Sequence, residues 1–161
     1  MPTINLQDDI YLINMAYEQA FLASNRDEVP VGAVIADESG KILACVHNNK
    51  EASNDPCGHA EIICLREAAK KIGNWRLQGC VLYVTLEPCP MCLAAMVQAR
   101  IGRCVFGTYD SKGGAISLGY NLYKDPRLNH SFSICGGLQH YENSKLLSDF
   151  FRRKRNSYKG L

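Results

Sequence analysis

The amino-acid sequence predicts a three-layer α/β/α fold, in which a five-stranded mixed sheet is flanked by helices. Short runs of apolar and β-branched residues alternate with segments of helical periodicity, which is the pattern of strands connected through helices. Two of these runs flank a turn at Ser39-Gly40, as is typical of an antiparallel hairpin. We therefore expect a largely parallel core sheet, covered on both faces, with the hairpin as its antiparallel part.

The expected elements follow one another without an internal repeat or a linker. Apolar spacing predicts helices over residues 9–24, 58–73, 90–100 and about 141–158. Strands are expected in the hairpin 31–48 and in the runs 80–86, 103–108 and 131–137. Asp8 or Asp9 is available to cap the first helix, and Gly73 to end the second. This succession fits one domain over residues 1–161.

Composition and charge limit the possible settings of the protein. The formal charge of +2, from 18 basic and 16 acidic residues, does not by itself indicate a nucleic-acid partner. No export signal and no apolar run near the ~18 residues of a membrane span are visible, so we expect a cytoplasmic protein without a membrane partner. Thiols stay reduced there. Five cysteines are expected to be small buried apolar side chains: Cys45, Cys64, Cys80, Cys104 and Cys135.

Three residues have the types and spacing of a zinc site. Cys89 and Cys92 lie two residues apart where the chain turns into a helix, and His59 begins another helix. Catalytic zinc takes three protein ligands and keeps one position open for water, whereas structural zinc is closed by four. The N–H groups exposed at helix starts also favour the thiolate form of cysteine.

Glu61 adds a possible proton carrier beside these ligands. A carboxylate on the first helical turn could take a proton from water and return it to a leaving group. Taken singly, a first-turn glutamate is often only a helix cap, and one Cys-x-x-Cys is a weak motif. His-x-Glu at one helix start with Pro-Cys-x-x-Cys at the next is, however, the pattern of zinc nucleobase deaminases.

With these motifs the sequence resembles the cytidine/nucleotide deaminase superfamily, and within it the enzymes that act on adenosine in tRNA. The resemblance covers nearly the whole chain. Its matching segments are "VPVGAVI", "DPCGHAEI", "GNWRL", "LYVTLEPCPMC", "ARIGRCVFG", "NHS" and "LLSDFFRRKR". The zinc motif alone does not select the substrate, because similar proteins that deaminate guanine or free nucleosides share it.

The resemblance implies hydrolytic deamination of adenosine to inosine at the wobble position of a tRNA anticodon. It implies one Zn²⁺ per subunit held by His59, Cys89 and Cys92, with Glu61 as the catalytic proton shuttle, while water attacks C6 of adenine and ammonia leaves. It further implies a homodimer that binds the anticodon stem-loop of tRNA.

Contacts with the substrate are also carried over by resemblance. They are expected from Val29, Asn48, Asp110, Asn129 and Phe151, each of which could instead be an ordinary core, turn, loop or helix residue. The residue types near the C-terminus also indicate RNA binding without the resemblance. Basic side chains that follow two aromatic residues can contact phosphates while the aromatic rings stack on neighbouring bases. The expected backbone contacts are Arg152, Arg153, Lys154 and Arg155.

Two alternatives remain open. The same chemistry could act on a free purine such as guanine, or the chain could be a non-catalytic RNA-binding module with a structural zinc. The second alternative requires a fourth protein ligand, for which Cys57 is a candidate, although a fourth sulfur would close the site to water. Ile116 also stands where the related enzymes usually have glycine, so the 113–119 loop is expected to differ in shape.

Overall fold

The computed structural model describes residues 5–160, within which there are four α-helices, one short 3-10 helix and five strands. In chain order they are α1 (Leu6–Asn25), β1 (Gly32–Ala36), β2 (Ile42–His47), α2 (Ala60–Ile72), β3 (Val81–Leu86), α3 (Pro90–Gln98), β4 (Arg103–Thr108), η1 (Leu122–Lys124), β5 (Ser133–Cys135) and α4 (His140–Lys159).

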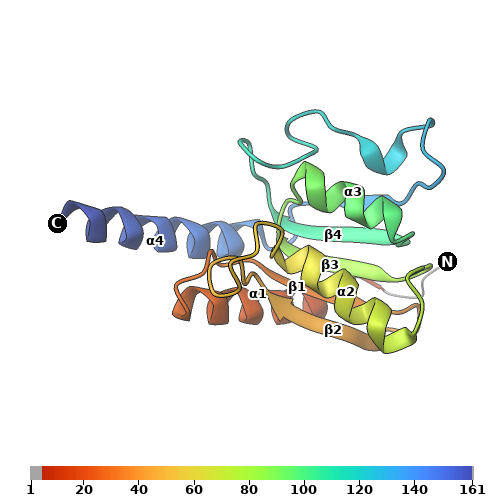
Figure 1. The fold of residues 1–161 in the computed structure, drawn as a ribbon, viewed down its shortest axis with the longest axis horizontal. Coiled ribbons are helices and arrows are strands. Elements are labelled where there is room, and N and C mark those ends of the chain that lie inside the picture. The colour runs from red at the N-terminus through yellow and green to blue at the C-terminus, as the bar shows by residue number, and fades with distance from the viewer. Residues whose placement is uncertain (1–4, 161) are drawn as a thin grey trace.

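The five strands form one sheet in the order β2-β1-β3-β4-β5 (Figure 1). β1 runs antiparallel to both β2 and β3, while β3, β4 and β5 are parallel to one another. The predicted five-stranded mixed sheet is confirmed. Its antiparallel part is larger than the hairpin alone, because β1 also pairs with β3.

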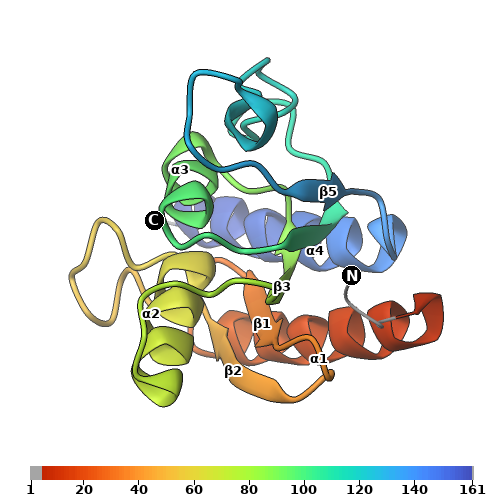
Figure 2. The ribbon, with the colours of Figure 1, turned by 90° about the vertical axis from the view of Figure 1, so that its right-hand side faces the viewer.

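Helices cover both faces of the sheet (Figure 2). On one face, Leu65 of α2 and Leu93 of α3 belong to the same buried cluster as Leu82 of β3. On the other face, Ile13 of α1 packs in a second cluster with Val34 of β1. Full burial of such a side chain stabilises the fold by roughly 1.5 to 3 kcal/mol, so these two clusters fix the three layers.

The start of α1 differs from the prediction. Asn5 is the N-cap, and its side chain accepts a hydrogen bond from the backbone N–H of Asp8 while the Asp8 carboxylate accepts one from Asn5. Asp9 is instead buried and accepts hydrogen bonds from Tyr83 and Arg103. The prediction of Asp8 or Asp9 as the cap was wrong because contacts with the sheet turn Asp9 inward.

All strands except β1 run in the same direction, so their carboxyl ends share one edge of the sheet. α3 follows β3 closely, with Cys89 as its N-cap and Pro90 in the first helical position, where the missing N–H of proline costs nothing. α2 begins only after a loop of residues 48–59 that returns from β2, with His59 as N-cap. Both helix starts therefore lie at the same edge.

The last helix, α4, was expected at about 141–158 and is present at His140–Lys159. Its base is anchored on β4: Asn143 and Phe150 are buried, and a Cβ added at Gly107 would lie only 2.4 Å from the Asn143 amide nitrogen. Beyond these contacts α4 projects past the sheet (Figure 1).

All eight cysteines are free thiols, as expected. Cys64, Cys80 and Cys104 are buried and Cys45 is half-buried, but Cys135 is exposed. The prediction of burial was wrong for Cys135, because it ends a three-residue strand at the edge of the sheet. Within residues 5–160 no helix combines the length and apolarity needed to cross a bilayer.

Candidate active site

His59, Cys89 and Cys92 meet where α2 and α3 begin. The Nδ1 atom of His59 lies 3.6 Å from the Cys89 sulfur and 3.5 Å from the Cys92 sulfur. All three ligand atoms lie within 4.8 Å of one another. The two helix starts thus bring together residues 30 and 33 positions apart in the sequence.

The geometry of this triad fits a zinc ion. For Zn–S near 2.3 Å and Zn–N near 2.0 Å, a tetrahedron has nitrogen-to-sulfur edges of roughly 3.5 Å, which agrees with both distances. Among the residues described, the cluster contains three ligand side chains. Cys57 is exposed and is not part of it, so the fourth position remains available, as in a catalytic zinc site.

The two thiols are electrostatically coupled. The hydrogen bond from Cys92, together with His59, lowers the pKa of the Cys89 thiol to about 4. The same bond to Cys89, together with burial, raises the pKa of Cys92. The interaction with Cys89 also raises the pKa of His59. A divalent cation between the two sulfurs favours both thiolates, since it replaces the shared proton.

Glu61 lies beside the triad on the first turn of α2. Its side chain is buried, with 4% of its surface exposed, and burial raises the pKa of the carboxyl to about 7. The carboxyl is within hydrogen-bonding reach of the Cys92 thiol. A carboxyl group with a pKa near neutrality can both accept and return a proton, which is what general acid and base catalysis requires.

His59, Cys89 and Glu61 line a cleft of about 280 Å³, whereas Cys92 is fully buried and does not line it. This volume lies near the lower end of the range for small-molecule sites. Three of the predicted contact residues line the cleft: Val29, Asn48 and Asp110. Asn48 is itself held in place, because its amide donates to the Val29 carbonyl at 3.2 Å and accepts from the Lys50 backbone N–H.

Asn129 lies elsewhere. It is on the loop before β5, where its side chain accepts a hydrogen bond of 2.9 Å from Arg100, which follows the C-cap of α3. Because the triad is at the start of α3 and Arg100 follows its end, the length of this helix separates Asn129 from the cleft. Within this chain the structure does not bring Asn129 together with the other predicted residues.

Phe151 lies in a second hollow of about 730 Å³ between the end of α1 and α4. Val29 lines both this hollow and the cleft, so the two are adjacent. Arg155, Tyr158 and Arg26 also line the second hollow, which we call the α4 groove. It combines aromatic rings with basic side chains, and Asp27, Glu28 and Glu51 line it as well.

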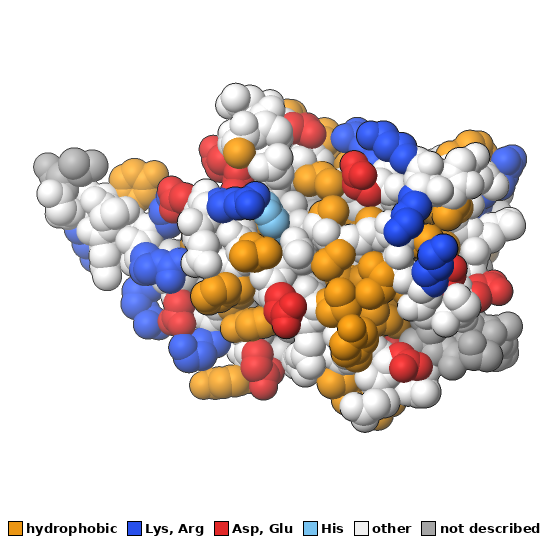
Figure 3. All heavy atoms as spheres, turned by 90° about the horizontal axis from the view of Figure 1, so that it is seen from below, with side chains coloured by type: hydrophobic (Ala, Val, Ile, Leu, Met, Phe, Trp, Pro, Cys, Tyr) orange, Lys and Arg blue, Asp and Glu red, His pale blue; other side chains and the backbone are white. Residues whose placement is uncertain are grey.

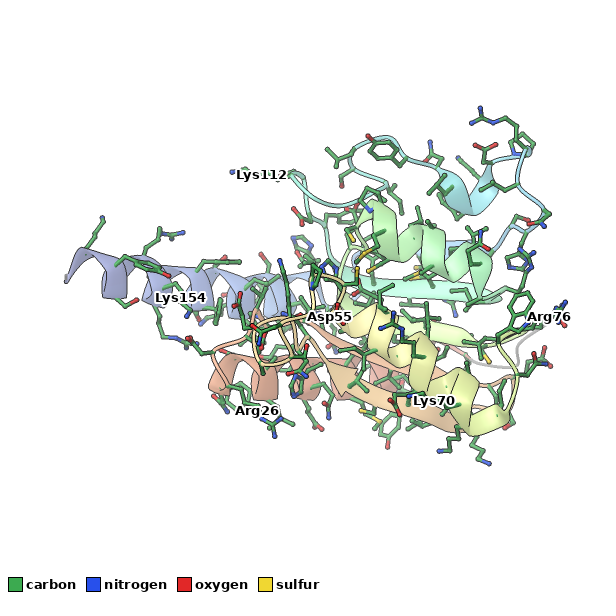
Figure 4. All side chains as sticks on the ribbon, in the orientation of Figure 1. Arg26, Asp55, Lys70, Arg76, Lys112 and Lys154 are labelled. Carbon is green, nitrogen blue, oxygen red and sulfur yellow. The ribbon has the colours of Figure 1, made fainter. Side chains whose placement is uncertain are left out.

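The four basic residues of α4 differ in their surroundings. Lys154 forms an ion pair with Asp27, Arg153 donates to the Ser24 hydroxyl at 2.7 Å, and Arg152 pairs with Asp149. Lys and Arg side chains gather where α4 projects (Figure 3). In Figure 4, Lys154 on α4 and Lys112 on the loop after β4 lie toward this end, whereas Lys70 and Arg76 lie toward the other.

Several residues of the cleft escaped the sequence analysis. Lys50, Val31 and Leu86 line it, as does Gly113. Glu87, in the quoted segment "TLEPCPMC", also lines it and is buried, but no role was predicted for it. Two features of the sequence pointed to these residues: an acidic residue at the end of an apolar strand, and the Gly113-Gly114 pair. Neither feature shows which other residues it lies against in the fold.

This fold and site define a class of protein. A mixed sheet that brings a His-Cys-Cys triad and a buried glutamate to one edge is the arrangement of a zinc-dependent deaminase. The family model for the cytidine and deoxycytidylate deaminase zinc-binding region matches residues 6–108.

Similarity to individual proteins shows which kind of deaminase this chain resembles. The chain is 42% identical to the tRNA-specific adenosine deaminase of Bacillus subtilis (strain 168), over 95% of this chain and 94% of the relative. A solved structure from a study of A-to-I editing by tRNA:A34 deaminases matches with a TM-score of 0.81 and 40% identity, covering 85% of this chain and 99% of that one. Guanine deaminase from Bacillus subtilis matches less well, with a TM-score of 0.61 and 34% identity, over 73% and 71% of the two chains. The chain therefore belongs to the cytidine and deoxycytidylate deaminase family and, within it, to the tRNA-specific adenosine deaminases.

Proposed function

We propose that this protein converts adenosine to inosine at the wobble position of a tRNA anticodon, with zinc bound by His59, Cys89 and Cys92. The observation that carries the proposal is the buried Glu61 beside a three-ligand triad, of which His59 and Cys89 line the same cleft as Glu61. A structural zinc site would need four protein ligands and has no use for this carboxyl group. Similarity to tRNA-specific adenosine deaminases supports the choice of substrate.

In this proposal Glu61 is the proton carrier. Zinc supplies Lewis acidity and brings the pKa of water close to neutrality. Water adds at C6 of adenine, the bond from C6 to the amino nitrogen breaks, and ammonia leaves. Glu61 would take one proton from water as it adds and deliver it to the ring nitrogen N1. It would then take the second proton, from the hydroxyl now on C6, and deliver it to the departing amino nitrogen, so that C6 keeps a carbonyl oxygen and the carboxyl ends in its initial state.

The cleft sets the form of the substrate. A small pocket accepts a base only after the base leaves its stack, and a single-stranded loop can present one in this way. We propose that Val29, Asn48 and Asp110 contact the target nucleotide or its neighbours, and that Phe151 stacks with an adjacent base. The basic residues of α4 would contact phosphates. Asn129 is 2.9 Å from Arg100 and would reach RNA only at another part of the complex.

The wider parts of the proposal are a single deaminase domain over residues 1–161, a homodimer and a cytoplasmic location. One zinc per subunit is proposed because the described residues contain one such triad. Sedimentation of the zinc-loaded protein tests the dimer, and fractionation of cells that express it tests the location.

The test of activity is incubation of zinc-loaded protein with total tRNA, followed by mapping of inosine by sequencing. We expect inosine at position 34 of one or more tRNAs, and none with Glu61→Gln. Glu61→Gln should keep one zinc per chain while turnover falls by about 10²- to 10⁴-fold. Efficient turnover of free guanine, with anticodon stem-loops left unchanged, would refute the choice of substrate.

A further inference from the structure

Glu87 is a second buried carboxylate at the cleft, distinct from the proton carrier. It follows β3 and precedes Cys89 by two residues, with 2% of its surface exposed. Among the residues described, it takes part in no ion pair. Its oxygens accept hydrogen bonds from the backbone N–H of Asp110 at 3.2 Å and of Ser117 at 2.9 Å, and from the Ser117 hydroxyl at 2.5 Å.

All these donors belong to one loop, residues 109–119, which connects β4 to the segment before η1. Backbone bonds attach the same loop to the same place: the Ala115 N–H donates to the Pro88 carbonyl at 2.8 Å, and the Glu87 N–H donates to the Thr108 carbonyl at 2.8 Å. The start and the middle of the loop are therefore both fixed to the segment that carries Cys89.

Gly114 shows how closely the loop wraps around this carboxylate. A Cβ at residue 114 would lie 2.0 Å from a Glu87 oxygen and 2.7 Å from the Asp110 carbonyl oxygen, so only glycine allows this approach. Asp110 completes the turn, because one of its oxygens accepts from the N–H groups of Lys112 and Gly113. The loop is shaped around Glu87 on one side and Asp110 on the other.

We propose that Glu87 is a positioning residue that fixes the wall of the cleft formed by Asp110 and Gly113, and thereby sets the affinity for the RNA next to the target base. This inference rests on the proposed function, since the bound RNA is its substrate. Glu87 acts through the loop and does not itself transfer a proton.

The chemistry of the side chain makes the proposal testable with an isosteric change. A carboxylate offers only acceptors, whereas the amide of glutamine turns one acceptor into an NH₂ donor. In Glu87→Gln one of the loop donors therefore loses its acceptor, with almost no change in volume. Ser117→Ala is a milder variant that removes only the hydroxyl bond.

Asp37 provides a matched control. One of its oxygens accepts from the Ser39 N–H and hydroxyl and from the Lys41 N–H, which is the same set of donors as at Glu87. It lies in the turn between β1 and β2, at the edge of the sheet opposite the cleft. Asp37→Asn should loosen a loop in the same way without touching the active site.

The first measurement is hydrogen exchange of the full-length, zinc-loaded variants. In Glu87→Gln we expect the backbone amide that faces the new NH₂ group, of Asp110 or of Ser117, to exchange about tenfold faster, as after loss of a hydrogen bond to a charged group, while the 49–58 loop keeps its protection. Unchanged exchange at both of these amides would refute the role of Glu87 in holding the loop.

The second measurement is steady-state deamination of an anticodon stem-loop with adenosine at the wobble position. For Glu87→Gln we expect KM to rise about tenfold and kcat to stay within about threefold, with one zinc per chain. Ser117→Ala should show a smaller rise and Asp37→Asn none. Faster loop exchange with an unchanged KM, or an equal rise in Asp37→Asn, would overturn the inference. If the wild-type protein left the stem-loop unmodified, the proposed function would fail instead, and the exchange experiment would still decide whether Glu87 holds the loop.

Discussion

The phenolic hydroxyl of Tyr83 donates a hydrogen bond of 2.7 Å to Asp9, which joins the middle of the sheet to the first helix. Tyr83 is fully buried in β3, and Arg103 of β4 binds both oxygens of the same carboxylate at 3.1 and 2.8 Å. The three side chains satisfy one another, so a polar network holds α1 against an otherwise apolar face of the sheet.

Removal of Asp9 should therefore destabilise the fold strongly. In Asp9→Ala, Tyr83 and the partly buried Arg103 lose their acceptor, and we expect the free energy of unfolding to fall by about 3 kcal/mol. Urea denaturation followed by circular dichroism measures the change. Glu67→Ala is the control, because Glu67 only pairs with Lys70 at 3.9 Å on the exposed face of α2, and it should change stability by less than about 0.5 kcal/mol. Equal effects of the two substitutions would contradict the network.

The same network predicts a loss of stability at alkaline pH. Burial, with the hydrogen bond to Asp9, raises the pKa of Tyr83 above its usual value of 10.0. The native state thus retains a proton that the unfolded chain releases, so the contribution of Tyr83 to stability is constant below pH 10 and falls as the pH rises further. Tyr83→Phe has no such proton, so its stability should fall less steeply above pH 10. Parallel unfolding curves for the two proteins between pH 9 and 11 would show that Tyr83 is not protected.

The α4 groove predicts a residue-specific effect of salt on RNA binding. Arg155 lines it beside Phe151 and Tyr158, and contact with one phosphate releases condensed counterions. Arg155→Gln should weaken binding of any stem-loop and reduce the slope of log K against log salt by about 0.7 to 1. Lys70→Gln, toward the other end of α2 (Figure 4), is the control with the same change of charge. Identical slopes for wild type and Arg155→Gln would remove this residue from the interface.

Thiol labelling tests the metal site without RNA. In zinc-loaded protein a bulky thiol reagent should react rapidly with the two exposed cysteines, Cys57 and Cys135, because Cys64, Cys80, Cys92 and Cys104 are buried. Removal of zinc by a chelator should then add Cys89, which is half-buried and has a thiol pKa lowered to about 4, to the reactive set. Cys45 is also half-buried, but burial raises its thiol pKa, so it should react slowly in both states. Mass spectrometry of the labelled peptides identifies each site. Fast labelling of Cys89 with zinc still bound would place it outside the metal centre.

The sequence was sufficient to predict the features that depend on local residue patterns, namely the strands, the helices and the zinc ligands. Alternating apolar runs and helical stripes indicated the sheet and its helices, and the ligand triad followed from two helix starts that each carry sulfur or imidazole. The cap of α1 was mispredicted because the sheet, not the local sequence, decides where Asp9 points. The partners of Glu87 are 23 and 30 residues away, and the position of Asn129 depends on the path of the 109–131 segment. A local sequence pattern cannot predict contacts between residues that lie so far apart in the sequence.

The geometry of α4 has a consequence for how the chain can vary. The helix has 20 residues, which corresponds to a length of about 30 Å. Successive side chains are rotated by about 100° about the helix axis. Asn143 and Phe150 fix one part of it to the sheet, while Arg155 and Tyr158 face the groove farther along. Inserting a single residue after Phe150 would rotate everything beyond it by more than a quarter turn and move both groups away from the groove. A substitution in α4 therefore changes one side chain, whereas an insertion or deletion between Phe150 and Arg155 would reorient every side chain that follows it.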